Sequence, residues 1–184
     1  MFSLVLVLAL TCVSLQRRLS LHALCFEPLD RGDSNCENPE KGIRWYFDEE
    51  LHECFEYLYE GCGGGRNTFN TRQDCALNCL PADAHHCPFN VRSTGTCRRD
   101  RKCPAGSTCS MGQFFGICCD DKNRELWIEE TNPKCEEGSS LSMRTAWHGK
   151  EPRLGRNCSH KFCPDGYECV QTKHFAHCCS KSSK

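Results

Sequence analysis

The chain has 184 residues, and 19 of them are cysteine, a proportion typical of proteins held together by disulfide bonds rather than by a large core. The 23 lysines and arginines nearly balance the 24 aspartates and glutamates, so no overall charge draws the chain to nucleic acid or to an anionic membrane. The composition therefore argues against a single enzyme domain with a large cleft. It predicts several small, cross-linked units and no nucleic-acid partner.

Residues 1–14 begin the chain with an apolar segment. The apolar run from Phe2 to Val13 is too short to span a bilayer. The small residues Cys12 and Ser14 suit cleavage after Ser14. We therefore predict a signal peptide over residues 1–14; the alternative is a buried N-terminal strand or helix. Cleavage leaves 18 cysteines, an even number, which predicts a secreted protein with a disulfide framework. No later apolar run is long enough for a membrane anchor.

The 18 remaining cysteines fall into three consecutive groups of six, which predicts three disulfide-rich modules. We expect a first module at residues 25–79 and two cysteine-rich repeats at residues 87–119 and 135–179. Residues 80–86 and 120–134 are expected as linkers, although Leu126, Trp127 and Ile128 could pack locally. The three groups are Cys25, Cys36, Cys54, Cys62, Cys75 and Cys79; Cys87, Cys97, Cys103, Cys109, Cys118 and Cys119; and Cys135, Cys158, Cys163, Cys169, Cys178 and Cys179.

The second and third groups form an internal repeat. Both contain the pattern C-P-x-G-x-x-C-x8-C-C, which begins at Cys103 in one copy and at Cys163 in the other. Because so long a pattern recurs, we expect a duplicated module. Proline followed two residues later by glycine predicts a tight turn in each copy. The copies differ after their first cysteine, where Cys87 is followed by a gap of 9 residues and Cys135 by a gap of 22.

The first module contains the patterns of one hairpin and one short helix. The aromatic-rich residues 44–47 and 54–59 suit two antiparallel strands joined by a turn at residues 48–53. Thr71 followed by Asp74 predicts a helix N-cap with an acidic residue in the first turn. The helix would carry Cys75 and Cys79 four residues apart and therefore on one face.

Residues 25–79 also carry an ordered series of motifs. They are Cys25-x-x-Pro28-x-Asp30-x-Gly32, Arg44-Trp45-Tyr46-Phe47-Asp48, Cys54-x-x-Tyr57-x-Tyr59-x-Gly61-Cys62, Asn67-x-Phe69 and Cys75-x-x-x-Cys79. With these motifs the module resembles a Kunitz (BPTI-type) protease-inhibitor domain. The resemblance implies a small disulfide-rich α+β fold, with a twisted antiparallel hairpin and a C-terminal helix. It also implies the disulfides Cys25–Cys79, Cys36–Cys62 and Cys54–Cys75.

The resemblance further implies that the segment flanking Cys36 enters the active site of a serine endopeptidase as a substrate-like loop. Glu37 would fill the specificity pocket of the protease, and the peptide bond between Glu37 and Asn38 would resist cleavage. The disulfide would hold the loop in its bound shape and so reduce the entropy cost of binding. The residues implied in the loop and its support are Cys36, Glu37, Asn38, Pro39, Gly61 and Cys62.

Two departures from the family pattern leave the function open. The gaps before and after Cys36, of 10 and 17 residues, are longer than is usual in the family, and a longer loop is less rigid. Glu37 would also be repelled by the carboxylate at the base of a trypsin-like pocket. The alternative is therefore a non-inhibitory extracellular binding or matrix protein. Within that alternative, Arg31-Gly32-Asp33 is the tripeptide that integrins recognise.

The two repeats are similar to the lustrin-type cysteine-rich repeats found beside Kunitz domains in secreted invertebrate proteins, and this similarity implies no chemistry. Because no catalytic or phosphate-binding motif is present, we expect neither enzyme activity nor a cofactor. His160, His174 and His177 lie near cysteine pairs that could bind zinc in a reducing compartment. A disulfide framework is favoured instead, so we expect no metal.

Two surface features suggest further partners or modifications. The segment 98–102 carries four basic residues and Asp100; it could bind a sulfated polysaccharide, although a solvated loop is the simpler interpretation. Asn157-Cys158-Ser159 has the form of a glycosylation site, with an uncommon cysteine in the middle position. The sequence identifies neither a target protease nor an oligomeric state.

Overall fold

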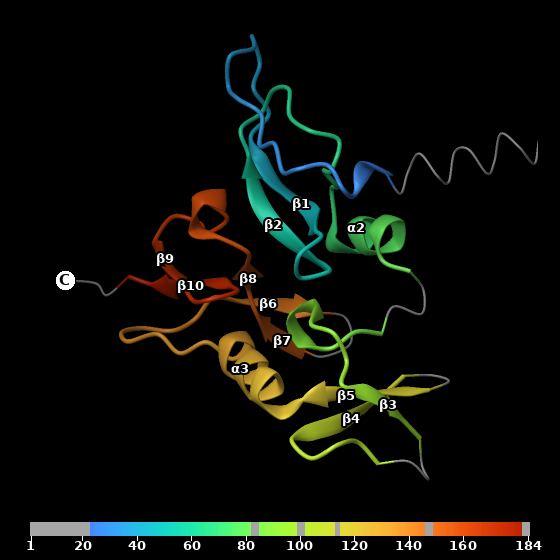
Figure 1. Ribbon diagram of the computed structural model, residues 1–184. Coiled ribbons are helices and arrows are strands. Elements are labelled where there is room, and N and C mark those ends of the chain that lie inside the picture. Colours follow the sequence, from blue (N-terminus) through green and yellow to red (C-terminus); the bar gives the residue numbers. More distant parts are fainter. Residues whose placement is uncertain (1–22, 82–84, 99–101, 113–114, 146–148, 182–184) are drawn as a thin grey trace, which may run out of the picture.

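The protein is described from a computed structural model (Figure 1), which covers residues 23–81, 85–98, 102–112, 115–145 and 149–181. The predicted signal peptide at residues 1–14 lies outside these ranges, as do residues 99–101 of the basic segment. Within the described ranges, no helix is long and apolar enough to cross a membrane. We call residues 25–79, 87–119 and 135–179 the first, second and third modules.

The first module is built on an antiparallel hairpin, as predicted. Strand β1 (Gly42–Asp48) pairs with strand β2 (Glu53–Tyr59), and each strand begins slightly before the predicted residue. Aromatic side chains favour this extended, half-buried conformation. In the turn between the strands, a carboxylate oxygen of Asp48 accepts a hydrogen bond from the Leu51 amide at 2.9 Å. This bond fixes the shape of the turn.

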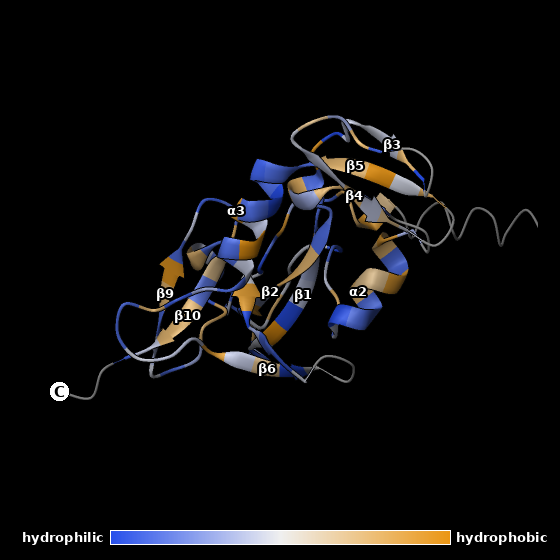
Figure 2. Ribbon diagram, turned by 90° about the horizontal axis from the view of Figure 1, so that it is seen from below, coloured by the Kyte–Doolittle hydropathy of each residue, from blue (hydrophilic) through white to orange (hydrophobic). Residues whose placement is uncertain are grey.

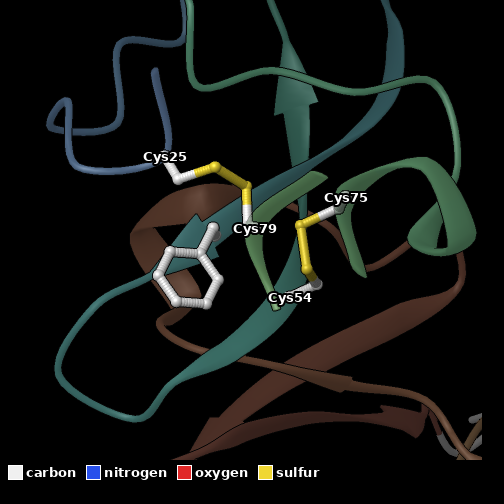
Figure 3. Packing of buried hydrophobic residues seen from close by; sticks show 5 residues of the cluster. Cys25, Cys54, Cys75 and Cys79 are labelled. Carbon is white, nitrogen blue, oxygen red and sulfur yellow. A yellow bond between two sulfur atoms is a disulfide. The ribbon is translucent and has the colours of Figure 1, made fainter. Parts of the chain in front are cut away.

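Helix α2 (Arg72–Cys79) closes the first module. The predicted N-cap is confirmed, because the Thr71 hydroxyl accepts a hydrogen bond from the Asp74 amide at 3.0 Å. Such a cap stabilises a helix by about 1 kcal/mol. The cysteines of the helix face a small core between α2 and the hairpin (Figure 3). That core consists of Cys25, Phe47, Cys54, Cys75 and Cys79.

Asn67 holds the segment after β2 against this core. Its side-chain oxygen accepts a hydrogen bond from the Phe47 amide at 2.9 Å. Its side-chain nitrogen donates to the carbonyls of Cys25, Glu27 and Phe47 at 3.1, 2.9 and 2.8 Å. Because Asn67 is only 3% exposed, these bonds satisfy backbone groups that water cannot reach.

The second and third modules share one sheet arrangement, in which the last strand lies between the other two. The register also agrees, since Cys109 lies opposite Cys118 and Cys169 lies opposite Cys178. The strands of the second module are β3 (Gly95–Cys97), β4 (Ser107–Met111) and β5 (Gly116–Asp120). Those of the third are β8 (Leu154–Gly155), β9 (Tyr167–Gln171) and β10 (Ala176–Ser180).

Disulfide pairing is also identical in the two modules: the first cysteine pairs with the sixth, the second with the fourth, and the third with the fifth. The predicted turns are present, with the Ser107 amide donating to the Pro104 carbonyl and the Tyr167 amide to the Pro164 carbonyl, each at 3.2 Å. The repeat in the sequence therefore corresponds to a repeated fold. The pairs are Cys87–Cys119, Cys97–Cys109, Cys103–Cys118, Cys135–Cys179, Cys158–Cys169 and Cys163–Cys178.

Smaller elements lie between these strands. The long gap after Cys135 contains an additional hairpin of β6 (Ser142–Thr145) and β7 (Gly149–Pro152). There are also two short 3₁₀ helices. In the second module, η1 (Pro88–Asn90) directly follows the first cysteine. In the third module, η2 (Cys158–His160) contains the second cysteine. The repeated modules therefore differ mainly outside their common sheet.

The segment 120–134, expected as a linker, instead contains helix α3 (Asp121–Thr131). Asp120 caps the helix by accepting a hydrogen bond from the Asn123 amide at 3.0 Å. Near the other end, Glu130 is only 5% exposed, and its carboxylate accepts bonds from the Thr172 hydroxyl and the His174 amide at 2.8 and 2.9 Å. The helix is thus fixed to the turn between β9 and β10.

The three modules also share a core. Phe175, in the turn between β9 and β10, packs with Tyr46, Leu51, Phe55 and Tyr57 of the first module. Phe89 of η1 and Trp127 of α3 pack against the same cluster. Figure 2 shows the third-module strands and α3 beside the hairpin, with an apolar stretch along β5. The chain therefore buries apolar surface between modules as well as within them.

Candidate functional site

The loop that the sequence implicates in inhibition, residues 33–41, is exposed along its whole length. At one end, Asp33 and Cys62 exchange backbone hydrogen bonds at 3.0 and 2.9 Å. At the other end, the Glu40 amide donates to the Gly61 carbonyl at 3.3 Å. Between them, the Cys36–Cys62 disulfide joins Cα atoms 6.0 Å apart. The loop is therefore both accessible and attached to residues 61–62.

Two glycines permit this close attachment. Gly32 has a φ of +67°, and a Cβ atom there would lie 2.1 Å from the carbonyl oxygen of Cys62. Gly61 has a φ of +114°, and a Cβ atom there would lie 2.8 Å from the Glu40 nitrogen. Other residues rarely adopt such φ values, and any side chain would force the two segments apart. The glycines thus set the distance between the loop and its support.

Glu37, Asn38 and Pro39 occupy the exposed part of the loop directly after the disulfide. Within the described residues, none of these three side chains takes part in a hydrogen bond or ion pair with the rest of the protein. A binding partner can therefore contact them without breaking an internal interaction. The arrangement presents the backbone and side chains of residues 36–39 to solvent, with bends at residues 36–38.

Comparison with known proteins supports the resemblance seen in the sequence. Residues 24–80 match the Kunitz/Bovine pancreatic trypsin inhibitor domain. The chain is also 40% identical, over 157 residues, to a BPTI/Kunitz inhibitor domain-containing protein of Caenorhabditis elegans, covering 84% of this chain and 88% of that protein. The chain belongs to the Kunitz inhibitor family. The first module is its Kunitz domain, and the family is one of inhibitors rather than enzymes.

Two further relatives define the extent of the similarity. Major allergen Ani s 1 of Anisakis simplex is 32% identical over 166 residues, covering 84% of this chain and 86% of that protein. Kunitz-type serine protease inhibitor textilinin-3 of Pseudonaja textilis textilis is 38% identical over 55 residues, covering 30% of this chain and 61% of that protein. The nematode relatives therefore match well beyond the Kunitz domain, into the cysteine-rich modules.

Within the Kunitz domain, the disulfides are Cys25–Cys79, Cys36–Cys62 and Cys54–Cys75, the same pairs that the family resemblance implies. The first and third of these lie in the core beside α2 (Figure 3). The second lies at the surface and supports the loop. The three bonds thus separate into two that stabilise the fold and one that shapes the exposed segment.

Arg31, in the tripeptide considered for integrin binding, has its guanidinium engaged inside the protein. Its side chain is only 18% exposed, and Nε donates to the Leu58 carbonyl at 2.9 Å. The other guanidinium nitrogens contact the Ser159 carbonyl and the Glu60 carboxylate. An integrin would have to contact this guanidinium together with Asp33. Because the guanidinium is already engaged inside the protein, the tripeptide is not presented as a pair of free charges.

Glu60 is the central residue of this region that the sequence did not indicate. Its carboxylate contacts Arg31, Lys41 at 3.6 Å and Lys161 at 3.4 Å. Partial burial acts to raise the pKa of Glu60, but the hydrogen bond from Lys161 and the surrounding positive charges lower it below its ordinary value. Lys161 is 101 residues away in sequence, so no local pattern could have revealed the contact.

The cysteines considered for zinc binding are engaged in disulfides. In the described part of the chain, two groups bring suitable atoms within 4.8 Å of one another, and each contains a disulfide-bonded pair. A disulfide sulfur offers no thiolate for metal coordination. His174 instead contacts Glu130, with 3.1 Å between Nδ1 and a carboxylate oxygen. The groups are Cys97, Cys103 and Cys109, and Cys135, His177 and Cys179.

Proposed function

We propose that the protein is a secreted inhibitor of a serine endopeptidase and acts by substrate-like insertion of the loop at residues 33–41. The observation that carries this proposal is an exposed loop tied to residues 61–62 by a disulfide and backbone hydrogen bonds. A loop ordered before binding loses less conformational freedom on association and binds more tightly. Membership of the Kunitz family and the similarity to textilinin-3, which is named as a serine protease inhibitor, support the same function.

In this proposal Glu37 occupies the specificity pocket of the protease. The peptide bond between Glu37 and Asn38 is the one that resists cleavage, and Pro39 limits the backbone conformations that follow it. A pocket with a carboxylate at its base would repel Glu37 and leave its charge without hydration. We therefore expect a target whose pocket offers positive charge or hydrogen-bond donors, rather than a trypsin-like enzyme.

Titration of the full-length protein against four serine proteases tests this proposal. The proteases should prefer basic, aromatic, small and acidic residues, respectively. We expect submicromolar inhibition of the enzyme that prefers acidic residues, and a shift toward the trypsin-like enzyme for Glu37→Arg. Glu49→Arg is the matched control, because it makes the same charge change in the exposed turn of the hairpin. If neither the natural protein nor Glu37→Arg inhibits any of the four, the inhibitory function is refuted.

A non-inhibitory extracellular binding or matrix protein is the second candidate. It is favoured by the acidic Glu37 and by the long gaps of 10 and 17 residues around Cys36. In that case the Kunitz fold serves as a scaffold, and no protease assay would respond to substitutions in the loop. Retention by extracellular matrix, unaffected by Glu37→Arg, would distinguish this function from inhibition.

We also propose an assignment for the remaining segments. Residues 1–14 are a signal peptide, residues 80–86 connect the Kunitz domain to the second module, and the second and third modules are lustrin-type repeats. The shared disulfide pairing and shared sheet of the two modules support their common origin. Sequencing the N-terminus of the secreted protein tests the first assignment, with Leu15 expected as the first residue.

A further inference from the structure

The base of the Kunitz loop is connected to the third module by a cluster of charges. Glu60, directly after β2, is contacted by Arg31 from the segment before the loop and by Lys41 from the end of the loop. Lys161 of the third module contacts the same carboxylate at 3.4 Å. One carboxylate therefore joins both ends of the loop to a residue of the third module that lies 101 positions further along the chain.

Arg31 makes this connection through its backbone as well as its side chain. Its carbonyl accepts a hydrogen bond from the Glu60 amide at 2.9 Å, and its Nε donates to the Leu58 carbonyl. One terminal guanidinium nitrogen donates to the Ser159 carbonyl of the third module. Because the side chain is largely buried, loss of this carbonyl would leave part of its charge without a partner.

The turn that carries Ser159 is itself fixed to the Kunitz hairpin. Arg156, shortly before η2, contacts the Asp48 carboxylate at 3.3 Å. The ring of His160, at the end of η2, meets the ring of Tyr46 edge-on, with 5.4 Å between centroids. The turn cannot move away from the hairpin without breaking both contacts. It therefore provides a firm support for Arg31.

We propose that the third module is a brace for the inhibitory loop, in which Lys161 and the Ser159 carbonyl are positioning groups that hold the loop base through Glu60 and Arg31. This inference rests on the proposed inhibitory function. The loop is longer than is usual in the family, and a longer segment loses more conformational freedom when a protease binds it. Fixing its base from a second module restores part of the rigidity that the added length removes.

Charge reversal at Lys161 tests the brace in the full-length protein. Lys161→Glu places a second carboxylate beside Glu60 and repels the third module from the loop base. Arg156→Gln loosens the turn that carries Ser159 without changing a residue of the loop. This second variant still tests the brace if Lys161→Glu folds poorly. Lys173→Glu is the matched control, because it makes the same charge change at an exposed position between β9 and β10.

Two readouts separate the brace from the inhibitory function. We expect Lys161→Glu and Arg156→Gln to raise the inhibition constant by about tenfold and to speed amide hydrogen exchange in residues 33–41, while Lys173→Glu changes neither. If both variants match Lys173→Glu in both readouts, the brace is refuted. If the natural protein inhibits no protease, the proposed function fails, and exchange in residues 33–41 alone decides whether the third module orders the loop.

Discussion

Phe175 offers a direct test of whether the three modules stabilise one another. It is 3% exposed, and its ring centroid lies 5.9 Å from that of Phe55 in the Kunitz domain and 5.8 Å from that of Phe89 in the second module. Phe175→Ala therefore removes a ring that all three modules contact. Truncating a buried phenylalanine to alanine lowers the free energy of unfolding by about 3–5 kcal/mol, since it removes apolar contacts and leaves a cavity.

Differential scanning calorimetry of the oxidised protein measures this effect. For a chain of this length, each kcal/mol lowers the melting temperature by about 2–4 °C, so Phe175→Ala should lower it by roughly 6–20 °C. Phe115→Ala is the control, because Phe115 is 50% exposed and its loss should change stability by about 0.5 kcal/mol or less. Equal melting temperatures for the two variants would mean that packing between modules contributes no stability, and the argument from the shared core would be wrong.

Two further predictions concern buried polar groups. Burial lowers the pKa of His177 below its ordinary value of 6.5, so the unfolded chain binds a proton first as the pH falls, and the free energy of unfolding should decrease below about pH 6.5. Both ring nitrogens of His177 are buried and have no hydrogen-bond partner among the described residues, so His177→Leu should keep the fold and flatten this decrease in urea titrations at pH 5 to 8. An unchanged pH profile would exclude His177 as its source. Asn67→Ala should lower the free energy of unfolding by about 3 kcal/mol or more, because it leaves buried backbone groups unpaired. Urea denaturation should show no comparable loss for Asn78→Ala, at an exposed position on α2, and equal losses would contradict the assigned role of Asn67.

Local features of the Kunitz domain could be predicted because short-range chemistry decides them. Thr71 caps α2 through a hydrogen bond to an amide three residues away, and a four-residue spacing places Cys75 and Cys79 on one helix face. The proline and glycine turns of the two repeats are equally local. The exposed position of Glu37 also agrees with the loop that the family motifs imply, whereas its role in a protease pocket remains a proposal.

Helix α3 shows where local reasoning was insufficient. The segment 120–134 is rich in charge, which predicts a linker, although Leu126, Trp127 and Ile128 could pack locally. The helix is instead fixed by Glu130, whose buried carboxylate accepts hydrogen bonds from the turn between β9 and β10. A charged residue in a sequence normally indicates solvent exposure, and only a partner from a distant segment makes its burial favourable.

The number and order of the modules, the cysteine-rich framework and the Kunitz motifs follow from the sequence alone, because cysteine spacing and turn residues act over short distances. The sequence could not show which module surfaces meet. Arg153 contacts the carboxylate of Glu56, 97 residues away, and Arg31 faces Ser159, 128 residues away. Whether a charge lies in solvent or in such a contact depends on how the folded modules fit together, because only their packing brings the two partners within reach and removes the water between them.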